Sequence, residues 1–358
     1  MPALPAPVRD PSAWRADDLR ADRSWEWRLG ADEVAELEHA TAAVRSRGLR
    51  AAEFGREEFE LPNVAKRLGE AQRELEEGRG FVLLRGLPVD SRDEEDAARL
   101  LWGLGTHLGT ALGQHERVNV GGFRANLLAH IVDQGLDYNA PNVHGSATSA
   151  EQAPHTDPAD VVGLLCVRPA VNGGTSRIAS AMTVFNELRS TRPDLVEVLL
   201  EGYAHDLRDQ QAPETGTRVT PRRIPVYSEF EGKLSCVFNS KTVLAGERKS
   251  GVPLTAIERE ALDAVVELSL RDDLRLDMAL EPGDLQLLNN YTMLHSRTAW
   301  KDIGPESRRV MMRLWLKVPN ARALAPGVAG GYSTGAHYDV AAQVAAKQAA
   351  SSQAAAHH

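Results

Sequence analysis

Two histidines and one aspartate occur in an order that suits a metal ion with one open face. His155 and Asp157 flank Thr156, and His295 follows far downstream. Side chains alternate along an extended segment, so His155 and Asp157 project to the same side and one short strand presents two ligands together. Two imidazoles and a carboxylate on one side of a metal leave the other side open, as in mononuclear non-haem Fe(II) oxygenases. The pattern therefore predicts oxygen chemistry at a metal bound by His155, Asp157 and His295.

A predicted strand after the second histidine carries two arginines on one face. Alternation along residues 308–317 places Arg309, Met311, Arg313 and Trp315 on the same side. An arginine that points inward needs an anion, because removing its charge from water is otherwise costly. We therefore expect Arg309 and Arg313 to face anionic groups, with Arg313 either binding substrate or forming a buried ion pair. Trp315 is expected to pack in the core.

These residues are part of a longer ordered set of motifs. The set comprises GFVLLRG at 80–86, PHTD at 154–157, GGTS at 173–176, EPGD at 281–284, NNYTMLHSR at 289–297, and Arg309 with Arg313. On these motifs the chain resembles the family of taurine dioxygenase and clavaminate synthase, which are Fe(II)- and 2-oxoglutarate-dependent oxygenases. The resemblance runs from about residue 80 to residue 319, which is most of the chain.

The resemblance implies a fold and a set of cofactors. The fold is mainly β with flanking helices, built on a double-stranded β-helix, also called a jelly roll. His155, Asp157 and His295 match the catalytic iron ligands of the family. The implied cofactors are Fe(II), the cosubstrate 2-oxoglutarate and O2.

The same resemblance implies where the cosubstrate and the substrate bind. Arg309, fourteen residues after His295, matches the arginine that binds the far carboxylate of 2-oxoglutarate. A hydroxyl residue that follows a Gly-Gly pair usually assists this arginine, and Thr175 and Ser176 are both candidates. Arg313 matches a second arginine that faces the primary substrate in similar enzymes, where it pairs with a carboxylate or sulfonate.

The implied reaction is oxidation of an unactivated C–H bond. The resemblance implies a dioxygenase that oxidises, above all hydroxylates, an aliphatic carbon of a small organic acid, an amino-acid derivative or a natural-product intermediate. Relatives that halogenate have a small residue at the position of Asp157, which leaves space for chloride, so the retained carboxylate favours hydroxylation. Desaturation, cyclisation and epimerisation with the same cofactors stay open.

Two other classes of protein fit part of the pattern. The same three ligands suit a zinc-dependent hydrolase, in which an open metal position activates water. Arg309 argues against this class, because a hydrolase has no need to bind a dicarboxylate cosubstrate. A metal-free binding protein on the same scaffold is the other alternative, but a complete ligand set is not expected there.

Composition favours a small-molecule substrate as the partner. The 358 residues carry a net charge of −9 and a pI of about 5.7, without a lysine- or arginine-rich run, which argues against nucleic acid or a membrane surface as partner. Cys166 and Cys236 lie in apolar runs, as expected of reduced core residues. No secretory signal and no apolar run long enough to span a membrane is found. We therefore expect a cytoplasmic enzyme, and homo-oligomerisation stays open.

The chain is expected to comprise an arm at residues 1–30, an oxygenase domain at 31–322 and a low-complexity tail at 323–358. Apolar periodicity predicts the elements of the domain. Helices are expected at 32–47, 62–77, 94–108, 181–189, near 194 and at 255–270, and strands at 80–86, 161–167, 176–179, 224–230, 234–238, after the turn at 282–284 and at 308–317. Two polar segments without a clear period, 113–152 and 206–223, are expected to form loops that wall the site.

Overall fold

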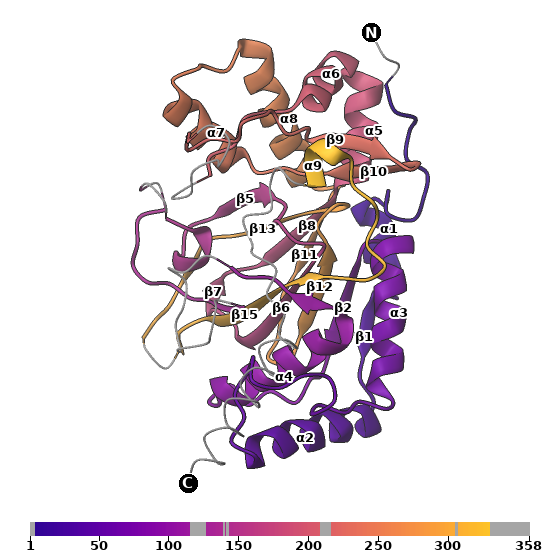
Figure 1. Cartoon of the computed structure of the whole chain (residues 1–358), viewed down its shortest axis with the longest axis vertical. Coiled ribbons are helices and arrows are strands. Elements are labelled where there is room, and N and C mark those ends of the chain that lie inside the picture. Colours follow the sequence, from indigo (N-terminus) through magenta and orange to yellow (C-terminus); the bar gives the residue numbers. More distant parts are fainter. Residues whose placement is uncertain are drawn as a thin grey trace, which may run out of the picture.

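The computed structural model describes residues 4–114, 127–138, 140, 143–207, 216–304 and 307–329. Within these residues, two β-sheets enclose a core and helices cover one outer face and one end of the pair (Figure 1). This is the predicted jelly roll with flanking helices.

The larger sheet has seven strands. Their order is β1-β2-β12-β6-β15-β3, and β4 also pairs with β15. All neighbours are antiparallel except β1 and β2. The bounds are β1 Glu26–Arg28, β2 Phe81–Arg85, β3 Thr110–Ala111, β4 Leu128–Ile131, β6 Val161–Arg168, β12 Leu285–Asn289 and β15 Val310–Lys317.

The smaller sheet has four strands in the order β11-β8-β13-β5. Their bounds are β5 Gln152–His155, β8 Ser176–Ser180, β11 Arg275–Met278 and β13 Met293–Arg297. An apolar cluster joins the inner faces of the two sheets, with Leu288 and Trp315 from the larger sheet and Ile178 and Met278 from the smaller one. A separate pair, β7 (Asn172–Gly173) with β14 (Trp300–Lys301), extends the strands near the cosubstrate motifs.

Three helices cover the outer face of the larger sheet. They are α2 (Ala31–Ser46), α3 (Val64–Glu77) and α4 (Glu94–Leu108), at the predicted positions. Their buried residues share one core cluster with alternate residues of β15, namely Val310, Met312, Leu314 and Leu316. The predicted alternation of β15 is thus confirmed, because its other face carries Arg313 and Trp315 into the space between the sheets.

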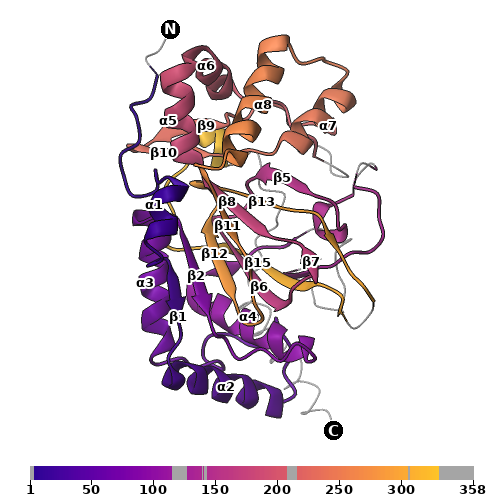
Figure 2. The ribbon, with the colours of Figure 1, turned by 180° about the vertical axis from the view of Figure 1, so that it is seen from behind.

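A second helical layer covers one end of the smaller sheet, as Figures 1 and 2 show from opposite sides. It consists of α5 (Ala181–Thr191), α6 (Pro193–Glu201), α7 (Ser240–Ser250) and α8 (Ala256–Leu270), with the hairpin β9 (Tyr227–Phe230) and β10 (Lys233–Cys236). The predicted cap of α5 is confirmed: the hydroxyl of Ser180 accepts a hydrogen bond from the backbone N–H of Thr183 at 3.0 Å. The remaining short helices are α1 (Ala16–Ala21), the 3₁₀ turn Gly145–Ala147 and α9 (Pro326–Ala329).

Several segments differ from the sequence-based expectation. Strand β4 lies within 113–152, which was expected to be a loop, and α7 was not predicted. Strand β5 ends at His155, so Asp157 follows the strand and is not part of it. These differences arise because short or weakly amphipathic segments take their structure from the elements they pack against.

The ends of the chain bear on the predicted domain boundaries. The expected arm at 1–30 includes α1 and β1, and β1 pairs with β2 in the larger sheet. Of the expected tail at 323–358, residues 330–358 lie outside the described residues, as do 115–126 and 208–215 in the two expected loops. The three boundaries stay predictions.

Two further expectations concern burial and membranes. Cys166 and Cys236 are buried and not joined in a disulfide, as predicted. In the part of the chain that the structure describes, no helix is long and apolar enough to cross a bilayer.

A pair of glycines tests the packing of α4 against the chain before α3. Replacing the helical Gly69 by Ala should stabilise the protein by about 1 kcal/mol, because nothing lies within 4 Å of the added Cβ and alanine favours the helix. The same change at Gly103 should instead destabilise it by about 1–3 kcal/mol, since the added Cβ overlaps the ring of Phe59. Urea unfolding monitored by circular dichroism measures both; equal effects at the two positions would contradict the packing described.

Candidate active site

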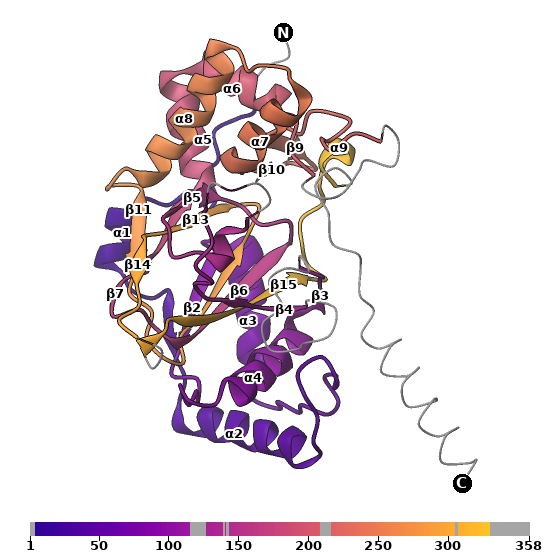
Figure 3. The same ribbon diagram turned by 90° about the vertical axis from the view of Figure 1, so that its left-hand side faces the viewer.

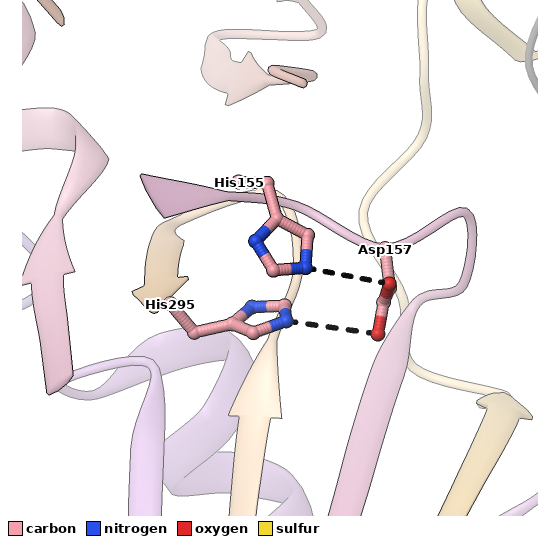
Figure 4. A group of neighbouring side chains, drawn as sticks. All are labelled: His155, Asp157 and His295. Carbon is pink, nitrogen blue, oxygen red and sulfur yellow. Dashed lines mark ion pairs between the residues drawn. The ribbon is translucent and has the colours of Figure 1, made fainter. Parts of the chain in front are cut away.

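The three predicted metal ligands converge, although His295 is far from the other two in sequence. The ligand atoms of His155, Asp157 and His295 all lie within 4.8 Å of one another. Nε2 of His155 lies 3.9 Å from Oδ1 of Asp157, and Nε2 of His295 lies 3.6 Å from Oδ2 (Figure 4). Both imidazoles thus point at the carboxylate, with their ring centroids 4.2 Å apart. Two nitrogens and a carboxylate oxygen meet at one point, as a facial metal site requires.

Strand register brings the two histidines together. His295 on β13 pairs directly with His155 on β5 and, on its other side, with Ile178 on β8. Directly paired residues project to the same face of an antiparallel sheet, with Cβ atoms about 5 Å apart. The histidines are therefore neighbours because of sheet pairing and not because of a local motif.

Asp157 is held by hydrogen bonds to segments from elsewhere in the chain. The backbone N–H of Thr156 donates to the carbonyl of Phe238 at 2.7 Å, and that of Phe238 donates to Oγ1 of Thr156 at 3.0 Å. The backbone N–H of Asp157 donates to Oδ1 of Asn290 at 3.0 Å. Asn290, in the motif that also contains His295, thus fixes the loop that carries the aspartate.

The protonation of these side chains fits a divalent metal. Nδ1 of His155 lies 2.9 Å from the carbonyl oxygen of Ala153, to which it can only donate, so Nε2 keeps the lone pair that faces the other ligands. Burial, followed by the nearby His295, lowers the pKa of His155 to about 3, so this imidazole is neutral near pH 7. A neutral imidazole and an ionised carboxylate are the forms that bind Fe(II), and the donor set therefore fits that ion.

The charge of Asp157 is stabilised from β15. Nη1 of Arg313 lies 3.2 Å from Oδ2 of Asp157, and the indole Nε1 of Trp315 donates to the same oxygen at 2.8 Å. Burial alone would raise the pKa of Asp157, but Arg313 and then His295 outweigh it and hold that pKa well below its usual range. The aspartate is therefore an anion before any metal binds.

Gln114 fixes Arg313 in turn. Nε of Arg313 donates to Oε1 of Gln114 at 2.8 Å, and Nε2 of Gln114 donates to the carbonyl oxygen of Arg313 at 2.9 Å. The amide thus binds both the side chain and the backbone of the arginine. Gln114 therefore supports the residue that supports Asp157.

Arg309 lies in a second cluster, around Trp300. Its Cζ is 4.5 Å from the centroid of the Trp300 ring, and the Cζ of Arg297 is 4.0 Å from the same ring. A Cβ at Gly174 would lie only 2.9 Å from Nε of Arg309. A glycine at this position, the second of the Gly-Gly pair, therefore lets the Arg309 side chain lie against the backbone. The cluster joins β13, β14 and the start of β15 at the motifs predicted to bind 2-oxoglutarate.

The two arginines of this cluster carry buried positive charge. Burial lowers the pKa of Arg309 to about 10 and that of Arg297 to about 9, with Arg309 adding to the latter shift, so both stay charged at neutral pH. Nη1 of Arg309 and Nε of Arg297 are buried and have no hydrogen-bond partner among the described residues. Arg297 also donates to the carbonyl oxygens of Thr148 and Ala150, at 3.1 and 2.6 Å. A buried guanidinium without a carboxylate partner favours binding of an anion.

The two candidate hydroxyl residues lie in different surroundings. Oγ of Ser176, on β8, donates to Oε1 of Gln286 on β12 at 3.1 Å, so it faces the space between the sheets. Thr175 adjoins Gly174, and its backbone N–H donates to Oγ1 of Thr298 at 2.9 Å. Either hydroxyl stays a candidate for assisting Arg309.

A cavity of about 490 Å³ opens on two of the predicted metal ligands, His155 and Asp157, and has a size typical of small-molecule sites. Arg313, Trp315 and residues of α7 also line it. Arg309 and the rest of the Trp300 cluster do not belong to its lining. The cavity lining and the Trp300 cluster therefore share none of the described residues.

The structure also contains residues that the sequence reasoning missed. Gln114, Arg297 and Trp300 were not singled out, and Trp315 was expected only in the core, whereas it is both buried there and bonded to Asp157. Arg297 lies two residues after His295 on β13, a strand that the sequence analysis does not predict, and the two-residue spacing was the available signal. The positions of Gln114 and Trp300 depend on contacts between distant segments, which no local pattern reveals.

A jelly roll with two histidines and one aspartate facing a cavity defines the class of mononuclear non-haem iron oxygenases. Residues 45–315 match the model of the taurine catabolism dioxygenase TauD, TfdA family. The chain belongs to this family and is a 2-oxoglutarate-dependent non-haem iron dioxygenase.

Individual relatives are similar over most of the chain. FR-33289 synthase of Streptomyces rubellomurinus is 29% identical over 324 residues, 89% of this chain and 93% of the relative. The taurine hydroxylase-like protein SAT17 of Stachybotrys chartarum is 27% identical over 322 residues, 87% of this chain and 80% of the relative. Asparagine oxygenase, solved with Fe(II), 3-hydroxyasparagine and succinate, has the same fold with a TM-score of 0.63 at 18% identity, over 82% of this chain and 93% of that chain.

The indole N–H of Trp315 gives a test of how Asp157 is oriented. Trp315→Phe keeps the ring packing but removes the donor to Oδ2, so we expect Fe(II) affinity to fall by about tenfold or more. Anaerobic chelator competition measures the affinity. Trp102→Phe is the matched control, since its Nε1 bonds only to the carbonyl of Phe54, away from the site. Equal affinities of both variants and the wild type would contradict an orienting role for Trp315.

Proposed function

We propose that this dioxygenase hydroxylates an aliphatic carbon of a small or medium-sized organic acid, with amino-acid derivatives and natural-product intermediates as the substrate classes. One observation carries the proposal: three candidate metal ligands converge, two of them line a cavity, and His295 shares β13 with Arg297 of a cluster of buried arginines that have no carboxylate partner among the described residues. The cavity suits the substrate and the arginines suit a dicarboxylate cosubstrate. A screen of organic acids for substrate-dependent succinate release tests the proposal, and the mass of each product separates hydroxylation from desaturation, cyclisation and epimerisation.

His155, Asp157 and His295 are proposed to hold Fe(II). When bound, iron and 2-oxoglutarate activate O2 for C–H oxidation, with succinate and carbon dioxide as co-products. Arg313 and Trp315 keep the Asp157 carboxylate ionised and in one orientation, so that the ligands are arranged before the metal arrives.

Arg309 is proposed to bind the far carboxylate of 2-oxoglutarate. The ring of Trp300 contacts the guanidinium of Arg309, and the backbone of Gly174 lies close to Nε of the same arginine. These two contacts restrict the position of the Arg309 side chain. The assisting hydroxyl comes from Thr175 or Ser176, and single alanine variants rank the two. Because the cluster is buried, it excludes water from the carboxylate and strengthens the charged hydrogen bonds.

The primary substrate is proposed to occupy the 490 Å³ cavity. Arg313 lines this cavity as well as pairing with Asp157, so it can contact an acidic group of a substrate close to the metal. The structures named above include an asparagine oxygenase in complex with a hydroxylated amino acid, 3-hydroxyasparagine. This supports an amino-acid-like substrate as one class to test.

The zinc hydrolase considered from the sequence is disfavoured. Membership of a dioxygenase family argues for iron, and two buried arginines around Trp300 would have no anion to bind in a hydrolase. We further propose that the enzyme acts in the cytoplasm and takes neither nucleic acid nor a membrane surface as partner. Self-association stays a prediction, which light scattering tests.

The first prediction here concerns the metal. His295→Ala should abolish stoichiometric Fe(II) binding and succinate release while the fold survives, because the ligand lies on a paired strand and closes no structural metal cage. Iron content after anaerobic dialysis and circular dichroism measure the two properties. His39→Ala, on the exposed side of α2, is the control and should keep full iron content. Normal iron binding by the His295 variant would overturn the ligand assignment.

The second prediction concerns the cosubstrate. Arg309→Leu should weaken 2-oxoglutarate binding by at least about tenfold, since charged hydrogen bonds to a carboxylate contribute about 1.5–3 kcal/mol. Anaerobic titration calorimetry on the Fe(II)-loaded protein measures the dissociation constant. The neighbouring Arg308→Leu removes the same charge and should leave the constant unchanged. An unaltered constant in the Arg309 variant would move the carboxylate site elsewhere, with Arg297 and Arg313 the next candidates.

A further inference from the structure

Helix α7 begins beside the metal ligands and is held in place along the cavity. Asn239, directly before the helix, forms a β-bridge with His155, and its side chain caps α7 by accepting a hydrogen bond from the backbone N–H of Thr242 at 3.1 Å. In its middle, a Cβ at Gly246 would lie 2.7 Å from the carbonyl oxygen of Ala204, so the helix packs directly on the chain there. Figures 1 and 3 show α7 above β5 in both views. The helix therefore has a fixed position relative to His155.

One stripe of α7 lines the cavity. The lining residues of α7 are Ser240, Lys241, Thr242, Ala245, Arg248 and Lys249. From Lys241 onward their spacing is that of a single helix face. Three of the six are cationic, although the whole chain has a net charge of −9. The cavity wall is thus more basic than the protein as a whole.

Two cations of the described lining pair with the two carboxylates there. Arg313 pairs with Asp157 at 3.2 Å, and Nζ of Lys249 lies 2.6 Å from Oδ1 of Asp206. The carboxylates of the described lining are therefore both engaged by cations of the same lining.

Lys241 supports the wall of the cavity. Its Nζ donates to the carbonyl oxygens of Tyr138 and Val143, at 2.6 and 3.0 Å, and lies 3.6 Å from the centroid of the Tyr138 ring. The lysine thus ties α7 to the segment that precedes β5.

Arg248 differs from the other cations of the lining. It is exposed near the C-terminal end of α7, and no hydrogen bond or ion pair joins its guanidinium to the described residues. It lies eight positions after Ser240, at the start of the helix, which corresponds to roughly 12 Å along the axis at 1.5 Å per residue. Arg248 therefore lines the cavity at a distance from the metal ligands.

We propose that Arg248 binds an oxyanion group at the far end of the primary substrate. The group is a carboxylate, sulfonate, phosphonate or phosphate, and the oxidised carbon lies near His155 and Asp157, on the order of 10 Å away. This inference rests on the proposed function and adds a specificity residue to it. Arg313, bonded to Asp157 and Gln114, serves the metal end of the cavity, whereas Arg248 selects substrates by charge and length.

A different reason for basic residues at this position is the helix dipole. Cations in the last turn of a helix stabilise it by about 0.3–1 kcal/mol whatever binds nearby. That reason predicts an effect on stability but none on ligand affinity. It also does not explain why Arg248 lies on the cavity face of α7. Measuring both ligand affinity and the free energy of unfolding on the same variants distinguishes the helix-dipole explanation from ligand binding by Arg248.

The experiment uses a set of probes that share a six-carbon chain and differ in the group at its end. Hexanoate, hexanesulfonate, hexylphosphonate and hexyl phosphate are titrated, beside neutral hexanamide, into the enzyme loaded with Fe(II) and 2-oxoglutarate without oxygen, at low salt. At least one anion should bind at least about tenfold more tightly than hexanamide, because a charged hydrogen bond is stronger than a neutral one. The ranking of the four anions identifies the oxyanion chemistry that the site prefers.

Variants assign the preference to Arg248. Arg248→Gln should weaken binding of the preferred anion by at least about tenfold, while its affinities for hexanamide and for 2-oxoglutarate stay those of the wild type. Arg248→Lys, which keeps the charge, should restore part of the lost anion affinity. Arg47→Gln removes the same charge at the end of α2 and is the matched control.

The outcomes separate this inference from the proposed function. Equal binding of anions and hexanamide by the wild type, or equal anion affinity in Arg248→Gln, overturns the role of Arg248 while iron and 2-oxoglutarate binding remain intact. A wild-type enzyme that does not bind 2-oxoglutarate at all would instead refute the proposed function. A true substrate that lacks an acidic group and has the same KM in Arg248→Gln also overturns the inference.

Discussion

The charge of Asp157 is the interaction on which the rest of the site depends. Taking a lone carboxylate out of water costs several kcal/mol unless hydrogen bonds and an opposite charge compensate it. Here Arg313 and Trp315 of β15 supply that compensation, while Asn290 and Phe238 hold the backbone around it. Residues of β15 in the larger sheet and residues that adjoin the smaller sheet thus all contact the segment that carries Asp157. The packing of the two sheets against each other therefore also arranges the candidate metal ligands.

Positive charge is concentrated near this centre in a protein that is acidic overall. Arg297 and Arg309 share the indole of Trp300, both buried and both charged, without an ion pair to the described carboxylates. Two like charges in a poorly solvated space repel each other, and a bound dicarboxylate relieves both the repulsion and the lost hydration. Helix α7 carries further cations along the cavity that His155 and Asp157 line. Both groups of cations favour anions, which suits an acidic cosubstrate and an acidic substrate.

Periodicity predicted the elements whose buried face is long and regular. Helices α2, α3, α4 and α8 and strands β2, β6 and β15 lie within a few residues of their expected bounds. The helices and β15 repeat apolar residues at a regular period, whereas β2 and β6 are short continuous apolar runs, which is typical of strands buried on both faces. Helix α7 escaped prediction because only Thr242, Val243 and Gly246 are buried in it, which is too little for a helical signal. Its start at Asn239 and its end at the left-handed Gly251 are readable caps, but they flank a segment without a clear period. Strand β4, four residues long, is a strand because β15 pairs with it.

The sequence by itself determined the chemistry: which side chains are able to bind iron and a dicarboxylate, and that Arg313 and Trp315 share a face of β15. These are local properties, set by side-chain type and by the period of two along a strand. Only the tertiary structure decided the partners: that His295 pairs with His155, that Arg313 and Trp315 both contact Asp157, that two arginines contact Trp300 and that α7 lines the cavity. Such contacts depend on register between strands far apart in the chain and on how helices pack over them. Neither is encoded in the spacing of neighbouring residues.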